Sequence, residues 1–510
     1  MPALQPLDRR LLLALIAVKL VIHLPLLGRY GFFRDELYFL DCGRHLAWGY
    51  VDHAPLVGLV GRALVSLGAS LPLVRLVPAL AGATTVALTV ILSRQLGGGR
   101  FAQGLAGIAI IISPIFLVLS SLFTMNAFEP LFWTGCALVV VHIVRSGDSR
   151  WWLAFGAIAG IGLENKHSMA FFGFAVVVAL LLTPLRRELG RRWIWLGAAI
   201  AGLLFLPNLV WQMQHGFPTL EDLRTVRAIG KNIVLSPLAF LAEQVVIVHP
   251  VLAPVWIGGL WFLLIGRGRG FRIVGWTFVA LVATLLVLNG KSYYAAPVYP
   301  LVLAAGGVAL EGWFDAASGR WPGRLARAAV LTAVAVLGAV TAPLFIPVLA
   351  PADLVAYQEY IGFAPGKTEV HHVGPLPQYF GDQFGWPELV ADIAAIYNGL
   401  PEDERAIACI FANNYGEAGA INLFGPSYGL PRAISGHQTY WFWGPDSCSG
   451  EVVIVTQGSA ERLREVFASV EEAGRHSHPW GMAEENQPIF VCRNPRVSLD
   501  ELWPQLKHWN

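Results

Sequence analysis

The sequence predicts an α-helical protein that crosses a membrane about eleven times and ends in a small soluble α/β domain. Three observations support this fold class. Only 14% of the 510 residues are charged and 55% are hydrophobic, whereas about a quarter of the residues of an average soluble domain are charged. Apolar segments as long as a membrane-spanning helix recur through the first two thirds of the chain. After residue 350 the composition changes to a mixture of polar and apolar residues.

The expected membrane spans and their orientation follow from the apolar runs and from the arginines between them. We expect spans at residues 11–27, 73–93, 102–120, 125–143, 151–163, 169–185, 193–211, 238–264, 273–289, 295–311 and 326–349. If the N-terminus lies inside, every inner connection carries arginine, as the positive-inside rule requires. No small-residue cleavage site precedes Arg29, so we expect a retained first span and not a removable signal peptide. The net charge of +2 is too small to indicate a nucleic-acid partner.

The outer connections carry a different set of residues, although nothing in the orientation argument required this. Candidate functional residues gather there: Arg34, Asp35, Glu36, His53, Asn126, Glu129, Lys166, Lys291, Tyr293 and Tyr294. We therefore expect one shared external site in a transmembrane domain of residues 1–350, whose first external loop is residues 28–72. With an odd number of spans, the C-terminal domain, residues 351–510, is expected to lie outside as well.

The first loop is the densest cluster of ionisable residues in the chain. Residues 31–56 have the sequence GFFRDELYFLDCGRHLAWGYVDHAPL, and water or a site must hold these charges because hydrocarbon does not solvate them. Asp35 is the candidate catalytic carboxylate. Glu36 follows it, and adjacent helical side chains diverge by about 100°, so one would be the base and the other a structural or metal ligand. The alternative is an ordinary acidic helix N-terminus that the helix dipole stabilises.

Two other groups of polar residues in the outer connections have two interpretations each. His53 would bind a metal or a phosphate, or be a solvated histidine in the turn that Pro55 forces. Asn126 and Glu129 are three residues apart and share one helix face. Glu129 lies about one turn inside the membrane, where an ionisable group is either functional or paired with a cation. The arginines considered for such a pair are Arg34, Arg44 and Arg75.

Cations and aromatic residues mark the outer ends of later spans. Lys166 and Lys291 lie where a span meets the outside, and their ammonium groups suit a phosphate at the interface or simply extend toward water. Tyr293 and Tyr294 belong to the same group of residues or are explained equally well as an aromatic belt. His249 precedes Pro250, which is expected to kink the eighth span; the other interpretation gives His249 a supporting or metal-binding role.

Helices and strands alternate in the C-terminal part. Helices are expected at residues 386–400, 416–424 and 459–473, the last capped by Ser459 and Gly474, and strands at 407–411, 452–456 and 489–492. Asn414 to Ala420 (NYGEAGA) lacks the strand–GxGxxG–helix pattern of a nucleotide site, so we expect a tight turn and a helix there. The five cysteines show neither metal-ligand spacing nor a disulfide framework, and with three of them in this part at least one is unpaired.

The chain resembles a known group of membrane enzymes at the residues just described. It is similar to the polyprenyl-phosphate-sugar-dependent glycosyltransferases of the C-type membrane fold (GT-C), bacterial glycosyltransferase family 39 type, which include protein O-mannosyltransferases and lipid A aminoarabinose transferases. The similarity covers residues 8–349. Asp35-Glu36 matches the group's Asp-Glu pair, and His53-Ala54-Pro55-Leu56 matches its His-Pro-Pro-Leu with one proline replaced. Asn126 stands where the group commonly has an aspartate.

The resemblance implies transfer of a sugar from a polyprenyl-phosphate donor to a hydroxyl group of a lipid, envelope glycan or protein, at the external face of a bacterial inner membrane. It implies that Asp35 is the general base of an inverting displacement, and that Lys166, with Arg34 or Lys291, stabilises the leaving phosphate. No cofactor is required; a divalent metal is optional, and Glu36 with His53 would hold it. The alternative is a lipid or solute transporter, which is disfavoured because the ionisable residues lie near the outer ends of the spans and not at the midplane.

Overall fold

The computed structural model describes residues 2–316, 323–364 and 374–509, and the chain divides into two compact units. The first unit consists of Met1–Leu27, Pro72–Val210 and Val234–Val348. The second consists of Gly28–Leu71, Trp211–Ile233 and Leu349–Asn510. Most of the expected first loop and the expected C-terminal domain therefore fold together in the second unit, although they lie far apart in the sequence.

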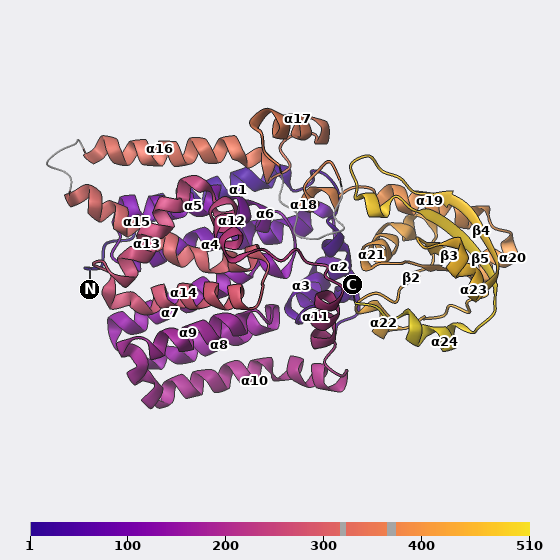
Figure 1. Ribbon diagram of the computed structural model, residues 1–510, viewed down its shortest axis with the longest axis horizontal. Coiled ribbons are helices and arrows are strands. Elements are labelled where there is room, and N and C mark those ends of the chain that lie inside the picture. The colour runs from indigo at the N-terminus through magenta and orange to yellow at the C-terminus, as the bar shows by residue number, and fades with distance from the viewer. Residues whose placement is uncertain (1, 317–322, 365–373, 510) are drawn as a thin grey trace. The chain divides into compact units, whose positions relative to one another are not determined.

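The first unit is a bundle of apolar helices (Figure 1). Six helical stretches of the described residues are long and apolar enough to cross a membrane, or up to eight if each of two bent pairs is one span. The helices of the unit are α1 (Arg9–His23), α4 (Leu71–Gln95), α5 (Arg100–Ile112), α6 (Pro114–Leu119), α7 (Glu129–Ser146), α8 (Trp152–Asn165), α9 (Met169–Leu181), α10 (Arg192–Gln214), α12 (Pro237–Val248), α13 (Ala253–Leu264), α14 (Arg272–Val287), α15 (Tyr299–Ala316) and α16 (Gly323–Thr341).

Two helices of the bundle expose almost their whole apolar surface. Only 11% of the most apolar window of α10, and 11% of that of α16, is buried. Figure 1 shows these two helices at opposite edges of the bundle. Leu203 of α10 and Leu325 of α16 are 68% and 67% exposed. A helix that is apolar all round and uncovered by protein fits contact with lipid.

Two expected spans are sharply bent and three are short. Residues 169–185 contain a bend of 109° before Pro184, and residues 238–264 contain one of 98° at His249-Pro250, which confirms the expected kink. Proline removes a helical hydrogen bond and clashes with the preceding turn. The expected span at 11–27 is the 15-residue helix α1, and the one at 151–163 is the 14-residue helix α8. The expected span at 102–120 is divided into α5, of 13 residues, and α6, of 6 residues. Helix length alone therefore does not give eleven crossings.

The second unit contains a mixed five-stranded sheet with the strand order β2-β1-β3-β5-β4. Strands β1 and β2 are parallel, as are β1 and β3, whereas β5 is antiparallel to both β3 and β4. The central strand β3 is buried at every position, as its run of β-branched residues predicts. The strands are β1 (Ala408–Phe411), β2 (Ala433–Ile434), β3 (Val452–Thr456), β4 (Phe467–Arg475) and β5 (Pro488–Pro495).

Short helices from all three parts of the chain complete the second unit (Figure 1). From the first loop come α2 (Arg34–Arg44) and α3 (Leu56–Ser66), and from the middle segment α11 (Pro218–Ala228). The C-terminal part supplies α17 (Pro351–Ile361), α18 (Gln378–Gly381), α19 (Trp386–Gly399), α20 (Glu402–Ile407), α21 (Tyr415–Phe424), α22 (Tyr440–Trp443), α23 (Ala460–Val466) and α24 (Leu499–Leu502). The elements expected at 386–400, 407–411, 416–424, 452–456 and 489–492 are confirmed.

The helix expected from Ser459 to Ala473 is wrong beyond Val466. Ser459 does cap a helix, because its side chain accepts a hydrogen bond from the backbone N–H of Arg462, but that helix has seven residues. The chain then enters β4, the edge strand, and Gly474 lies at an irregularity of this strand instead of capping a helix. Pairing with β5 outweighs the helix propensity of the glutamates and alanine in this segment, and charged side chains are usual on an edge strand.

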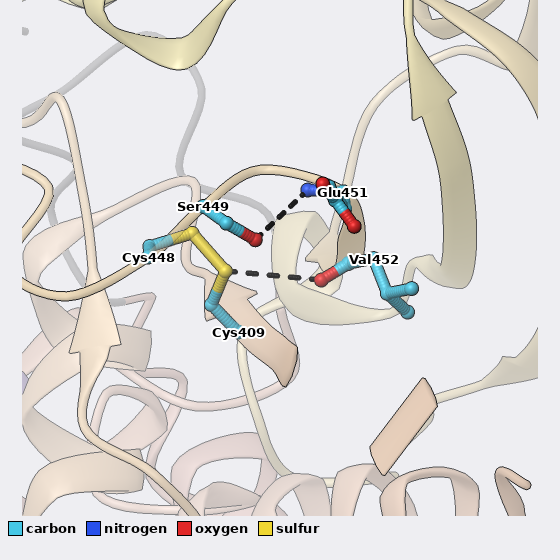
Figure 2. Close-up of a disulfide and its surroundings, with 5 residues drawn as sticks. All are labelled: Cys409, Cys448, Ser449, Glu451 and Val452. Carbon is cyan, nitrogen blue, oxygen red and sulfur yellow. Dashed lines mark hydrogen bonds between the residues drawn. A yellow bond between two sulfur atoms is a disulfide. The ribbon is translucent and has the colours of Figure 1, made fainter. Parts of the chain in front are cut away.

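One disulfide joins β1 to the segment that precedes β3 (Figure 2). It links Cys409 to Cys448, which are 39 residues apart in sequence. Cys492 is a free, buried thiol, so the expectation that at least one of the three C-terminal cysteines is unpaired is confirmed. The sequence pattern had not indicated this pair.

We expect the double substitution Cys409→Ser/Cys448→Ser to destabilise the second unit by about 2–4 kcal/mol, because the bond closes a loop that is otherwise free in the unfolded chain. The measurement is the thermal melting of the purified protein in detergent. Wild-type protein treated with a reductant is the matched control and should melt like the double variant. Identical melting of oxidised wild type and the double variant would contradict the prediction.

Candidate functional site

Helix α2 carries three of the expected site residues, and its own sequence fixes where it begins. Phe33 is extended, and its backbone N–H donates a 2.8 Å hydrogen bond to the carboxylate of Glu36, which is fully buried. This contact satisfies a backbone donor that the helix leaves unpaired, and the helix dipole favours the negative charge there. Glu36 therefore has the structural role of a capping residue. Its catalytic and metal-binding roles stay predictions.

Asp35 accepts a hydrogen bond from the C-terminal part of the chain. The phenol of Tyr415, the first residue of α21, donates to Oδ1 of Asp35 at 2.8 Å. Burial and the nearby charge of Asp35 raise the pKa of Tyr415 well above its usual value, against the opposing effect of Arg34. The phenol therefore keeps its proton and remains a donor at neutral pH.

Arg34 is engaged inside the second unit. Its guanidinium lies 3.5 Å from a carboxylate oxygen of Asp382, with 15% of the arginine side chain exposed, and 5.6 Å from the centroid of the Tyr415 ring. Burial alone would lower the pKa of Arg34, but the negative charge of Asp382, with further contributions from Asp35 and Glu485, raises it well above its usual value. The expected contact of Arg34 with a donor phosphate stays a prediction.

The second aspartate of α2, Asp41, is fully buried and multiply hydrogen-bonded. It accepts from the side-chain amide of Asn422 at 2.6 Å and from the hydroxyl of Tyr440 at 2.5 Å, and Arg44 forms an ion pair with it. A buried carboxylate needs such partners to remain charged. Sequence reasoning placed Asp41 in the ionisable cluster but missed the partners of both aspartates in the C-terminal part, because nothing in one sequence indicates which segments pair.

The end of the first loop is packed and not solvated. His53 is fully buried, so its interpretation as a solvated histidine is wrong. Its Nδ1 lies 2.9 Å from the carbonyl of Ala54 and must carry the proton, and its Nε2 lies 3.6 Å from the sulfur of Cys42. Burial lowers the pKa of His53 to about 4, so the ring is neutral at pH 7.

Asp52 lies beside His53 and is held by Tyr38. The Tyr38 hydroxyl donates to Asp52 at 2.9 Å and lies 2.6 Å from the hydroxyl of Thr439. Burial raises the pKa of Asp52 to about 7, and the charge of Asp35 adds to this effect. Burial also raises the pKa of Asp222, in α11, to about 7, with a contribution from Asp52. Both groups therefore titrate near neutral pH.

The candidate residues that the structure describes do not form a recognisable metal centre. Within the described parts of the chain, no three His, Cys, Asp or Glu side chains are grouped so that they could hold a metal ion. The carboxylate of Glu36 is used by the Phe33 backbone and His53 faces Cys42. A metal held by Glu36 and His53 stays a prediction that these contacts do not support.

The first unit brings three other expected residues together around Lys166. Its ammonium donates to the side-chain oxygen of Asn126 at 2.6 Å and to a carboxylate oxygen of Glu129 at 3.2 Å, and lies 4.7 Å from the centroid of the Tyr294 ring. The side chains of Lys166 and Glu129 are 15% and 7% exposed. Glu129 also accepts a hydrogen bond from Ser168. The cation that pairs with Glu129 is therefore Lys166, not one of the three arginines considered from the sequence.

Lys291, Tyr293 and His249 are the remaining expected residues. Lys291 directly precedes the 3₁₀ turn Ser292–Val298, and its carbonyl accepts from the backbone of Tyr294. The rings of Tyr293 and Tyr294 are 4.8 Å apart and nearly perpendicular. His249 sits at the bend of the eighth expected span with φ = 104°, and its ring bonds the backbone N–H of Val251 and the hydroxyl of Thr341. These bonds stabilise the bend, which is a structural role.

Comparison with solved structures identifies the fold. The structure matches ArnT from Cupriavidus metallidurans bound to undecaprenyl phosphate with a TM-score of 0.62 and 16% identity, over 95% of this chain and 98% of that one. It matches the apo state of the same protein with a TM-score of 0.61, over 94% and 97% of the two chains. The chain has the fold of the C-type membrane glycosyltransferases.

Sequence comparisons agree with this GT-C assignment. The family model of dolichyl-phosphate-mannose-protein mannosyltransferases matches residues 52–211. The lipid A galacturonosyltransferase RgtD of Rhizobium johnstonii (strain DSM 114642 / LMG 32736 / 3841) is 26% identical over 271 residues, which are 51% of this chain and 56% of that relative. The match thus spans little more than half the length of the curated relative. The resemblance to the GT-C glycosyltransferases is confirmed.

The pKa of Asp52 predicts a pH-dependent stability. Its folded-state pKa of about 7 lies above the ordinary value of 3.8, so the folded state binds more protons between these values and loses stability as the pH rises from about 4 to 7. We expect Asp52→Asn, which cannot ionise, to raise the melting temperature relative to wild type by a few degrees more at pH 8 than at pH 4. Asp353→Asn, which removes an exposed carboxylate, is the control. A pH-independent difference would contradict the prediction.

The Lys166–Glu129 pair predicts a coupled stability effect. We expect Lys166→Met alone to destabilise the protein by about 3 kcal/mol, because it leaves the largely buried Glu129 without its cation. The double variant Lys166→Met/Glu129→Gln, which removes both charges, should recover much of this loss. Melting temperatures of wild type, Lys166→Met, Glu129→Gln and the double variant in detergent give the comparison. If the decrease in melting temperature of the double variant equals the sum of the decreases of the two single variants, the two residues are not coupled.

Proposed function

We propose that the protein is a membrane glycosyltransferase that transfers a sugar from a polyprenyl-phosphate donor to a hydroxyl group of an acceptor at the external face of a bacterial inner membrane. The GT-C fold, together with the undecaprenyl phosphate bound to ArnT, supports the donor class. The relative named as a lipid A galacturonosyltransferase favours a lipid acceptor over an envelope glycan or a protein. The observation that carries the proposal is Asp35, a carboxylate at a helix N-terminus with a hydrogen-bond donor held against it.

In this proposal Asp35 is the general base. It accepts the proton of the acceptor hydroxyl while that oxygen attacks the anomeric carbon of the sugar. The bond between this carbon and the phosphate oxygen breaks, and the polyprenyl phosphate leaves with the bonding electrons, so the configuration is inverted. The helix dipole and the Tyr415 hydroxyl favour the ionised carboxylate that the step needs.

The leaving phosphate carries negative charge that cations must stabilise. Lys166 is the first candidate, because it is largely buried and cationic groups in such sites interact strongly with phosphate. Its ion pair with Glu129 and its hydrogen bond to Asn126 hold the ammonium in one place before the donor binds. Arg34 and Lys291 complete the proposed set. A divalent metal is optional in this proposal.

The proposed topology has eleven spans with the second unit outside. Six long helices, two bent pairs and the three shorter helical segments of the first unit supply these crossings. The arginine distribution supports an N-terminus on the inner side. The disulfide between Cys409 and Cys448 supports an external location for the C-terminal part, because such bonds persist in oxidising compartments and are rare in the cytosol.

The test of the base is Asp35→Asn. We expect it to reduce sugar transfer at least about a hundredfold, since general-base catalysis contributes that much or more. Deletion of the gene, followed by mass spectrometry of lipid A and envelope glycans, identifies the missing product, and plasmid-borne variants are then compared at equal expression. Asp353→Asn, an exposed aspartate in the first turn of α17, should restore the product fully.

Two results would overturn this proposal. Undiminished transfer by Asp35→Asn would eliminate this residue as the base. Directional movement of a lipid or solute by purified protein in sealed vesicles, with no covalent product, would identify a transporter instead.

A further inference from the structure

Residues 414–422, with the sequence NYGEAGAIN, include Tyr415, which donates to Asp35, and hydrogen bonds of the segment itself hold its first turn. The side chain of Asn414 accepts hydrogen bonds from the backbone N–H groups of Gly416 at 2.9 Å and Glu417 at 3.0 Å. The carboxylate of Glu417 reciprocates by accepting from the backbone of Asn414 at 3.3 Å and of Asn413 at 2.8 Å. This capping box fixes where α21 begins, and thus fixes the position of Tyr415.

Two glycines of the segment allow α21 to approach α2 closely. A Cβ atom on Gly416 would lie 2.5 Å from Cγ of Arg34, and one on Gly419 would lie 2.8 Å from the carbonyl carbon of Leu37. Gly416 and Gly419 are three residues apart, as are Arg34 and Leu37, so each pair lies on one face of its helix. The two faces meet with no room for a larger residue in α21.

Hydrogen bonds to two carboxylates of α2 flank this glycine contact. Tyr415 donates to Asp35 at one end, and Asn422 donates to Asp41 at the other. The carbonyl oxygen of the Asn422 side chain accepts in turn from the backbone of Ala433, at the start of β2. The sheet, α21 and α2 are therefore connected by directional contacts that end at Asp35.

From these contacts we infer that Tyr415 is a positioning residue for the Asp35 base, and that segment 414–422 is the element by which the C-terminal part of the chain sets the orientation and charge of that carboxylate. The inference rests on the proposed function of Asp35. A hydroxyl that donates to a carboxylate stabilises its ionised form and restricts its rotation. Its loss should make the base harder to ionise without removing it.

Other charged groups near Asp35 must be separated from this effect. Arg34 precedes it on α2, and Asp52 and His53 interact with it from the end of the first loop. Burial lowers the pKa of His53 to about 4, so it is neutral where activity is measured. Asp52, with its pKa of about 7, would itself appear in a pH–activity profile. The test is therefore made both in the wild-type background and in Asp52→Asn.

The experiment is the pH dependence of sugar transfer by purified Tyr415→Phe, measured with the donor and acceptor that the deletion strain identifies. We expect the acid limb of kcat/KM to move to higher pH by about one unit, because a hydrogen bond to a charged group contributes roughly that much to its ionisation. Activity on the alkaline plateau should stay within about threefold of wild type. Tyr428→Phe, which removes the hydroxyl of an exposed tyrosine in the same part of the chain, should leave the profile unchanged.

A second variant keeps the test decisive if Tyr415→Phe folds poorly. Incorporation of 3-fluorotyrosine at position 415 preserves the ring and makes its hydroxyl a stronger donor, so the acid limb should move to lower pH. A uniform loss of activity with an unmoved acid limb in both variants would overturn the inference, as would a profile equal to that of wild type. If Asp35→Asn abolishes transfer while the Tyr415 variants keep the wild-type limb, the inference fails and the proposed function stands. If Asp35→Asn retains transfer, the proposed function fails first.

Discussion

The close packing of α21 on α2 is the constraint on which the candidate site depends. Helix α2 contains two carboxylates, Asp35 and Asp41, that bond side chains about 380 residues away in sequence. Both of these partners are distant in sequence, although Arg44 of α2 also forms an ion pair with Asp41, so the C-terminal part supplies hydrogen bonds that α2 does not supply itself. Glycine at 416 and 419 makes the approach close enough for the hydrogen bonds. The geometry of the first loop is therefore a property of the C-terminal part of the chain as well.

The same requirement governs the first unit. In an apolar bundle an ionisable side chain must find a partner, because burying an unpaired charge costs several kcal/mol. Glu129 and Lys166 form an ion pair, Asn126 and the Tyr294 ring contact the ammonium group, and Ser168 donates to the Glu129 carboxylate. Such a cluster is ordered in advance, so a ligand that binds there does not have to organise the cation first.

Much of the fold, but little of the pairing, could be predicted from the sequence. Apolar runs and arginine positions indicated the helices of the bundle, and short apolar segments, β-branched in β3, indicated β1, β3 and β5, because these signals are local. The prediction of a helix after Val466 was wrong because this segment forms a strand only through its pairing with β5. The sequence predicted that Asn126 and Glu129 share one helix face and that Lys166 lies on the same side of the membrane, but it did not predict the contact between them. The partners of Asp35 and Asp41 were missed, since one sequence does not reveal which distant segments touch.

The contacts of Asp35 bear on how the C-terminal part contributes to function. A separate appended domain could be removed or exchanged without altering the geometry of a site in the first loop. Here the backbone of Arg34 donates to the carbonyl of Asp382, Tyr415 donates to Asp35, and the Asp41 carboxylate binds Asn422 and Tyr440. Residues from α21, from α22 and from the end of α18 thus contact one eleven-residue helix. The proposed catalytic role of Asp35 therefore depends on residues 374–509, because their contacts hold the Asp35 carboxylate in its observed orientation in the folded second unit.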